Sequence, residues 1–119
     1  MSIENIARIH IVNETGHVIY SNRAPNDAVP PYAIQRTISK TVDQMGMSVA
    51  RIQWDIFGIS YAQVKVIAAD FNAELRTFDD TDVVSVIRGN ELDTYENDLN
   101  LHRVIFDAIF RYEELPTFD

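Results

Sequence analysis

Strict alternation of apolar and polar residues marks two segments of the chain as strands. In the segment from Ser48 to Phe57, one face of the expected strand carries the apolar side chains Ala50, Ile52, Trp54 and Ile56. The segment from Leu99 to Tyr112 alternates in the same way and places on one face Val104, Phe106, Ala108, Phe110 and Tyr112. Successive side chains of a strand point to opposite faces, so both segments are predicted to bury one face and to leave a polar face open.

A third strand is predicted from Tyr32 to Lys40. Its apolar residues Ile34 and Ile38 are expected on one face, and the other face would carry Gln35, Thr37 and Ser39. The segment from Asp43 to Gly46 has the composition of a turn and leads into the Ser48–Phe57 strand. These two strands are therefore expected to form a hairpin.

The clearest helix follows Gly58. Ser60 and Gln63 have the spacing of a capping box, in which each side chain accepts a hydrogen bond from a free backbone N–H at the helix start. Beyond them runs a continuous apolar stripe at helical spacing, made by Val64, Ile67, Ala68, Phe71, Leu75 and Phe78. This stripe is expected to cover the sheet.

The remaining segments carry weaker patterns. After Ser2, a possible helix N-cap, the first residues fit a helix or a strand, up to a turn from Asn13 to Gly16. A short strand is expected from His17 to Tyr20, followed by a loop from Ala24 to Pro31, where adjacent prolines exclude a helix. Near the C-terminus we expect a short strand, Val83 to Ile87, and then a loop, Gly89 to Asp98.

Taken together, these elements predict one α+β domain over residues 1–119. Its mainly antiparallel, twisted sheet would be covered on one face by one long and one short helix. The polar faces of the two long strands must then look at solvent or at another chain. One open sheet face is thus available for assembly.

Composition supports a globular domain. The 119 residues are 46% hydrophobic and 24% charged, and there is no cysteine, which excludes disulfides, thiolate metal sites and a cysteine nucleophile. The longest purely apolar runs are four residues, so no membrane segment or export signal is expected, and a cytoplasmic compartment fits.

Charge is uneven along the chain. Residues 1–60 hold equal numbers of acids and bases, so the net charge of -8 falls on the second half. The acids concentrate in one stretch, which contains Asp79, Asp80, Asp82, Glu91, Asp93, Glu96 and Asp98. Such density repels a phosphate backbone and argues against groove-binding to nucleic acid. The stretch is either a solvated acidic loop or a functional negative surface.

Motifs of catalysis and metal binding are missing from the sequence. The three histidines, His10, His17 and His102, do not have metal-ligand spacing on a helix, and the four glycines are isolated, so no phosphate-binding loop can be written. The acidic stretch lacks the glycine and final glutamate of an EF-hand. We therefore expect no metal, no cofactor and no enzymatic activity.

The order of elements resembles the tail-completion, or tail-terminator, family of long-tailed bacteriophages. The resemblance rests on three blocks: the strand and loop from His17 to Ser39 with its Ala24-Pro25 and Pro31-Tyr32 pairs, the strand and helix from Ala50 to Leu75, and the acidic loop and strand from Asp93 to Glu114. The family usually opens with a longer helix before its first strand, whereas here that strand is expected by His17.

The resemblance implies an architectural protein of the virion. About six copies would close a ring that caps the tail tube at its head-proximal end, contacts the tail tube protein and the head–neck connector, and lets DNA pass. Ring closure needs two complementary patches on each subunit, and the candidate contact residues are Ala24, Pro25, Pro30, Pro31, Tyr32 and Tyr95. Acids facing the bore would repel DNA, and the candidates are Asp55, Asp79, Asp80, Asp82, Glu91, Asp93 and Asp107.

Two other classes of protein fit the same composition. An acidic DNA mimic would present the carboxylates of the acidic stretch as a phosphate-like array along one ridge, and would inhibit a nucleic-acid-binding protein. A small enzyme subunit or ligand-binding domain would instead show an apolar pocket with converging polar groups.

Overall fold

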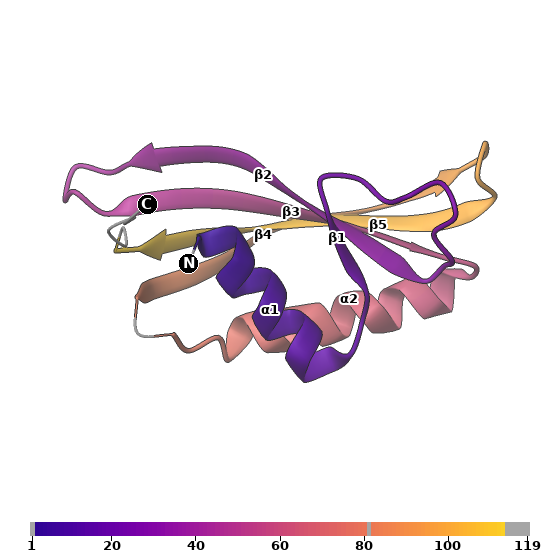
Figure 1. Cartoon of the computed structure of the whole chain (residues 1–119), viewed down its shortest axis with the longest axis horizontal. Coiled ribbons are helices and arrows are strands. Elements are labelled where there is room, and N and C mark those ends of the chain that lie inside the picture. Colours follow the sequence, from indigo (N-terminus) through magenta and orange to yellow (C-terminus); the bar gives the residue numbers. More distant parts are fainter. Residues whose placement is uncertain (1, 81, 114–119) are drawn as a thin grey trace.

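A computed structural model describes residues 2–80 and 82–113 of the chain, which form an elongated body of 44 × 28 × 24 Å. Both helices lie on the same side of a five-stranded sheet (Figure 1), which confirms the expected α+β class. In chain order the elements are α1 (Ile3–Thr15), β1 (Ile19–Ser21), β2 (Tyr32–Val42), β3 (Ser48–Gly58), α2 (Tyr61–Arg76), β4 (Val83–Glu96) and β5 (Leu101–Tyr112).

The first element of the described chain is a helix, whereas the sequence pattern of these residues fitted either a helix or a strand. Ser2 caps α1, because its Oγ accepts a hydrogen bond from the backbone N–H of Asn5 at 3.2 Å. The helix continues through the turn expected at Asn13 and stops at Gly16, whose φ of 73° is a left-handed conformation that glycine adopts without steric cost. One face of α1 enters the core through Ile3, Ala7 and Ile11.

α2 confirms both its predicted cap and its predicted stripe. Ser60 Oγ accepts a hydrogen bond from the backbone N–H of Gln63 at 3.1 Å. The Gln63 side chain accepts in return from the backbone N–H of Ile59 at 2.9 Å, one residue before the cap. The buried residues of the helix are Val64, Ile67, Ala68, Phe71 and Leu75, and Phe78 packs against the same core just beyond its end.

The strands are arranged in the order β1-β2-β3-β5-β4. Only β1 and β2 are parallel, and all other neighbours are antiparallel. The predicted hairpin is confirmed, since β2 and β3 pair from Tyr32 with Phe57 to Val42 with Ser48. The long strand β5 lies between β3 and β4, so its polar face sits in the middle of the sheet.

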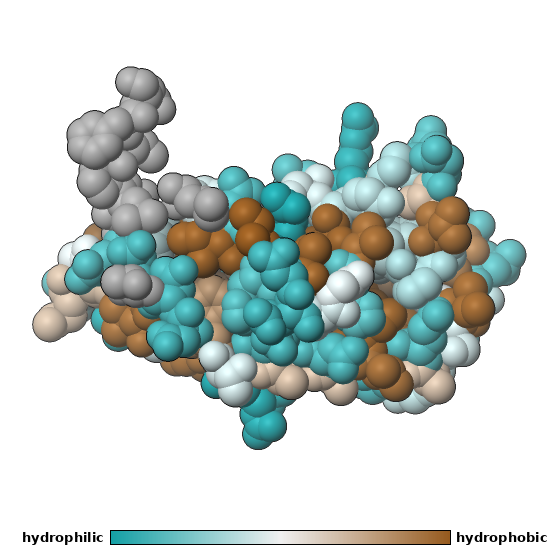
Figure 2. Space-filling view, turned by 60° about the horizontal axis from the view of Figure 1, so that its bottom comes forward, coloured by the Kyte–Doolittle hydropathy of each residue, from teal (hydrophilic) through white to brown (hydrophobic). Residues whose placement is uncertain are grey.

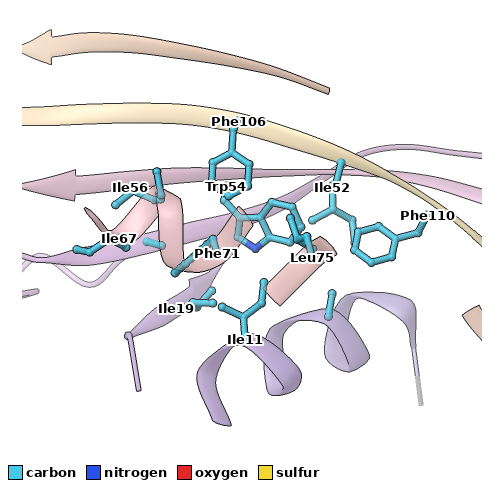
Figure 3. Close-up of a cluster of buried hydrophobic side chains, with 14 of the residues drawn as sticks. Ile11, Ile19, Ile52, Trp54, Ile56, Ile67, Phe71, Leu75, Phe106 and Phe110 are labelled. Atoms are coloured by element: carbon cyan, nitrogen blue, oxygen red, sulfur yellow. The ribbon is translucent and has the colours of Figure 1, made fainter. Parts of the chain in front are cut away.

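Aromatic side chains fill the core between the sheet and the helices (Figure 3). Trp54 of β3 stacks on Phe106 of β5 with ring centroids 5.3 Å apart, and Phe71 of α2 meets Phe106 edge to face at 6.0 Å. The predicted apolar faces of β3 and β5 are therefore the faces that the helices cover.

The face assignment of β2 from its sequence is wrong. Ile34 pairs with Asp55 and points away from the helices, and Ile38 is also exposed, whereas Gln35 is buried opposite Trp54. Burial of this amide is possible because Trp54 Nε1 donates to its oxygen at 2.9 Å and its nitrogen donates to the backbone carbonyl of Glu4 at 2.9 Å.

The segment expected as a loop between Gly89 and Asp98 is mostly strand. β4 runs without interruption from Val83 to Glu96 along β5, with a pairing irregularity between Arg88 and Glu91. Its side chains are largely exposed because it forms an edge of the sheet, and an edge strand needs little apolar character. Only Asn97 to Asn100 form the turn into β5.

Candidate assembly surfaces

The side of the sheet that carries no helix is here called the outer face. It consists of the strand residues whose side chains point away from the helices, among them Tyr32, Ile34, Arg36, Arg51, Gln53, Asp55, Phe57, Ile87, Leu92, Glu96, Leu101, Arg103, Ile105, Asp107, Ile109 and Arg111. Apolar side chains and charged side chains are mixed on this face. Ile87 and Leu92 at the β4 edge are more than half exposed.

Asp55 is the centre of an ion cluster on the outer face. Its side chain is only 1% exposed, and Arg36 Nη2 lies 2.6 Å from its Oδ2. Arg103 donates to the same oxygen and also reaches Glu96 at 2.7 Å, while Gln53 donates to Asp55 Oδ1 at 2.8 Å. Burial alone would lower the pKa of Arg103, but its hydrogen bonds to Glu96 and Asp55 raise that pKa above the usual value.

Two further arginine–aspartate pairs lie beyond the Asp55 cluster, toward the β2–β3 turn. Arg51 lies 2.5 Å from Asp107, whose other oxygen accepts the backbone N–H of Asn90 at 2.9 Å. Arg111 donates twice to Asp43 in the β2–β3 turn, at 2.8 and 3.1 Å. Burial acts to raise the pKa of Asp43, yet the hydrogen bonds from Arg111 and from two backbone N–H groups hold it below its usual value.

Charges on the outer face therefore balance. Four arginines (Arg36, Arg51, Arg103, Arg111) meet four acids (Asp43, Asp55, Glu96, Asp107), so 4 - 4 = 0 and the net charge of -8 belongs to the rest of the chain. Asp55 and Asp107, two of the candidate acids for the bore, lie on this face as predicted, but they are not open charges. Both are buried, because long arginine side chains from neighbouring strands lie over them.

Glu91 and Asp93 of the acidic stretch project toward the helix layer. Lys65 of α2 lies 2.6 Å from a Glu91 oxygen and 3.0 Å from an Asp93 oxygen, and Tyr61 donates to Asp93 at 3.1 Å. The hydrogen bond to Glu91 is the main reason that the pKa of Lys65 is raised, and Asp93 adds to it against the opposing effect of burial. One lysine thus offsets part of the charge of these two acids.

The other acids of the stretch are distributed over both ends of β4. Asp79, Asp80 and Asp82 lie between α2 and β4, where Asp80 accepts the backbone N–H of Asp82 at 3.0 Å. Asp98 lies in the turn at the opposite end of β4. Glu91, Asp93 and Glu96, which lie between these two ends, are paired with basic side chains. The DNA-mimic hypothesis requires one continuous ridge of free carboxylates, and the acidic stretch does not form such a ridge.

The Pro-rich loop forms one wall of a groove at one end of the outer face. This groove has a volume of about 490 Å³, and its walls and floor include Ala24, Pro25, Pro30, Tyr32, Ile34, Phe57, Leu99 and Leu101. Tyr32 stacks on Phe57 with centroids 5.2 Å apart, and burial raises the pKa of its hydroxyl. Four of the six predicted contact residues are thereby brought together.

The other two predicted contact residues lie elsewhere. Pro31 faces a small hollow beside His17 and Ile67, and Tyr95 packs edge to face on His102, whose ring also meets Tyr61 on the helix side. Sequence reasoning missed the contribution of Phe57, Leu99 and Leu101 to the groove. The sequence held one signal for this groove, because Leu99 is an apolar residue directly after a run of acids, and in the structure its side chain is 55% exposed.

The helix side of the molecule is polar, with hydrophobic residues in separate patches among hydrophilic ones (Figure 2). Two histidine–carboxylate contacts join its elements, His10 with Glu74 at 3.1 Å and His17 with Asp70 at 2.9 Å. Within residues 2–80 and 82–113, no three histidine, aspartate or glutamate side chains are placed to hold a metal ion. In that same part of the chain, neither helix has the length and apolar character needed to cross a bilayer.

Comparison with known proteins gives a structural match and no sequence match. No known protein family and no curated protein matches the sequence. The fold is similar to that of a chain in the solved structure of the virion of a native gene transfer agent particle, with a TM-score of 0.72 over 95% of this chain and 96% of that chain. The two sequences are 13% identical, so the likeness establishes a shared fold.

Proposed function

We propose that this protein is an architectural component of a phage-like particle, a tail terminator whose copies form a ring, with six the expected number. The observation that carries the proposal is the fold shared with a chain of a gene transfer agent virion over nearly the full length of both chains. The sequence blocks that resemble tail-completion proteins lead independently to the same class.

The outer face has the properties of a surface that is covered on assembly. Its charges are already paired within the chain, so a partner that covers it does not leave a lone ion without water. Ile87, Leu92, Ile105 and Ile109 between these pairs supply apolar area. Buried interfaces are poor in unpaired charge, and this face meets that condition without help from a partner.

Both edges of the sheet also offer contacts. β4 has a 14-residue edge that pairs with no further strand of the described chain, and β1 covers only the first residues of β2. Uncovered edges invite strand pairing, and the two edges differ in sequence. A contact between unlike edges of successive copies is heterologous, which is the kind that closes a ring.

The proposed partners are the tail tube protein on one side of the ring and a head–neck connector on the other, and the role requires no enzymatic activity and no cofactor. DNA would pass through the bore. Asp79, Asp80 and Asp82 form no ion pair with a described residue, so they are now the preferred candidates for acids that face it. Glu91 and Asp93 are weaker candidates because Lys65 offsets part of their charge.

The first test is direct imaging of the purified full chain over a concentration series, by mass photometry and by electron microscopy of negatively stained particles. Rings of uniform size that bind one end of purified tail tubes support the proposal. A chain that remains monomeric at all concentrations and also fails to bind tail ends contradicts it.

The second test concerns the bore. Asp79→Lys changes the charge by +2 per chain, or about +12 in a ring of six, and cations near the bore bind DNA through counterion release. DNA delivery should fall, more strongly at low salt, while Glu14→Lys on an exposed position of α1 makes the same charge change and should have no effect. Normal DNA delivery by the Asp79→Lys variant at every ionic strength would contradict the placement of Asp79 in the bore.

A further inference from the structure

The groove at the end of the outer face is built to bind an apolar segment. Its lining is dominated by Pro25, Pro30, Tyr32, Phe57, Leu99 and Leu101, and nothing in the described chain fills it. Aromatic and proline side chains side by side make a rigid, apolar floor that loses little entropy when it is covered. Arg23 at its margin has no acidic partner among the described residues.

The chain itself contains a segment of the complementary kind. After β5 the sequence continues as Glu-Glu-Leu-Pro-Thr-Phe-Asp, residues 113–119, in which Leu115, Pro116 and Phe118 stand between acids. Short proline-containing segments bind aromatic grooves because proline restricts the free peptide before binding. The acids suit the unpaired Arg23.

This segment leaves the sheet at the end opposite the groove. Leu101 lines the groove at the start of β5, whereas Tyr112 at its end pairs with Ser48 beside the β2–β3 turn (Figure 1). The eleven strand steps between them cover about 36 Å. The seven residues from Glu113 to Asp119 span at most about 25 Å. The segment is therefore too short to reach the groove of its own chain.

We propose that the groove binds residues 114–119 of a second copy of this chain. The contact joins opposite ends of two subunits, so it is heterologous and gives the assembly a direction. This contact requires only that two copies of the chain meet, and in the proposed ring it adds a specific link between neighbouring subunits.

Cysteine pairing in the full chain tests this contact, because the natural sequence contains no cysteine. Chains carrying Phe118→Cys are mixed with chains carrying Leu99→Cys under a mild oxidant, and covalent dimers are followed on non-reducing gels. The matched control replaces Leu99→Cys by Val66→Cys on α2, which is exposed to a similar extent. We expect the groove pair to form dimers at least about tenfold faster than the control pair, since a disulfide needs Cβ atoms within about 4.5 Å.

A chain that carries both Leu99→Cys and Phe118→Cys separates the possible occupants. A ladder of linked chains supports the exchange between copies, and a monomer without free thiols overturns it by showing that the segment reaches its own groove. Equal rates for groove and control pairs also overturn it. Asn26→Cys, at another exposed residue of the groove, replaces Leu99→Cys if circular dichroism shows that the latter misfolds. Mass photometry of the unaltered chain reports separately on ring formation, so the groove contact can be refuted while ring formation is supported.

Discussion

The ion cluster around Asp55 gives the most quantitative prediction. Asp55→Asn keeps the size of the side chain and removes its charge, while Gln53 retains an acceptor oxygen for its amide. Arg36 and Arg103 both lose a charged partner, but to different extents. Arg36 is 44% exposed and can turn to water, whereas Arg103 is 22% exposed and, among the described residues, keeps Glu96 as its acidic partner and the Phe57 ring beneath it.

The expected loss follows from these exposures. A hydrogen bond to a charged group contributes about 1.5 to 3 kcal/mol, and a solvent-exposed ion pair contributes about 0.2 to 1 kcal/mol. Assigning the first range to Arg103 and the second to Arg36 gives a loss of about 2 to 4 kcal/mol in the free energy of unfolding, close to the range of about 3 to 5 for breaking a fully buried pair.

Urea denaturation at a fixed, low protein concentration measures this loss, because assembly would otherwise add to stability. Asp70→Asn, which removes the partner of His17 at a 48% exposed carboxylate, is the control and should cost less than about 1 kcal/mol. The double variant Asp55→Asn/Arg103→Gln should lose less than the sum of its single variants. A loss below about 1 kcal/mol for Asp55→Asn, or strict additivity, would show that Asp55 is not the charge that holds the arginines.

Three further predictions address the core, the β4 irregularity and acid stability. Phe71→Ala should lower the free energy of unfolding by about 3 to 5 kcal/mol in urea, and a loss below about 1 would contradict the assigned core face. Gly89→Ala should cost about 1 to 3 kcal/mol, because its Cβ would lie 1.9 Å from an Asp107 oxygen; an unchanged midpoint would refute that close approach. Burial raises the pKa of Glu4, but Lys40 and Thr37 lower it more, so the stability it contributes is present above its ordinary pKa of 4.5 and is lost as the pH falls through the lowered value. Glu4→Gln should therefore reduce the dependence of the melting temperature on pH below 4.5, and an identical acid limb would exclude Glu4 as its source.

Periodicity predicted the fold where one side of an element is uniformly apolar. β3, β5 and α2 meet this condition, and their buried faces are confirmed residue by residue. β2 does not, because its buried position 35 is a glutamine whose hydrogen-bond partners, Trp54 and Glu4, are remote in the sequence. β4 was predicted too short because an edge strand faces water on most sides, and its acids and Gly89 have the composition of a loop.

The assembly surfaces were predictable only in part. Prolines and aromatic residues indicated the loop that walls the groove, since such residues stiffen a connection locally. The floor of the groove comes from β3 and β5, so Phe57 and Leu101 could be assigned to it only once the strand order was known. Pairing of Asp55 and Asp107 with arginines depends on the same order, and local sequence carries no signal for it.

The ion pairs of the outer face also bear on how the chain folds. Arg36 and Asp55 are 19 residues apart, whereas the pairs Arg51–Asp107 and Arg111–Asp43 are 56 and 68 residues apart. These two distant pairs form only after β3 and β5 have met, a late event because a long loop must close first. A slip of one residue between these strands would turn Asp55 or Asp107 into the helix-covered core and away from its arginine partners, at a cost of several kcal/mol per ion. The buried carboxylates thus select the correct alignment during folding, and neutral replacements should increase misaligned, aggregation-prone species as well as lower stability.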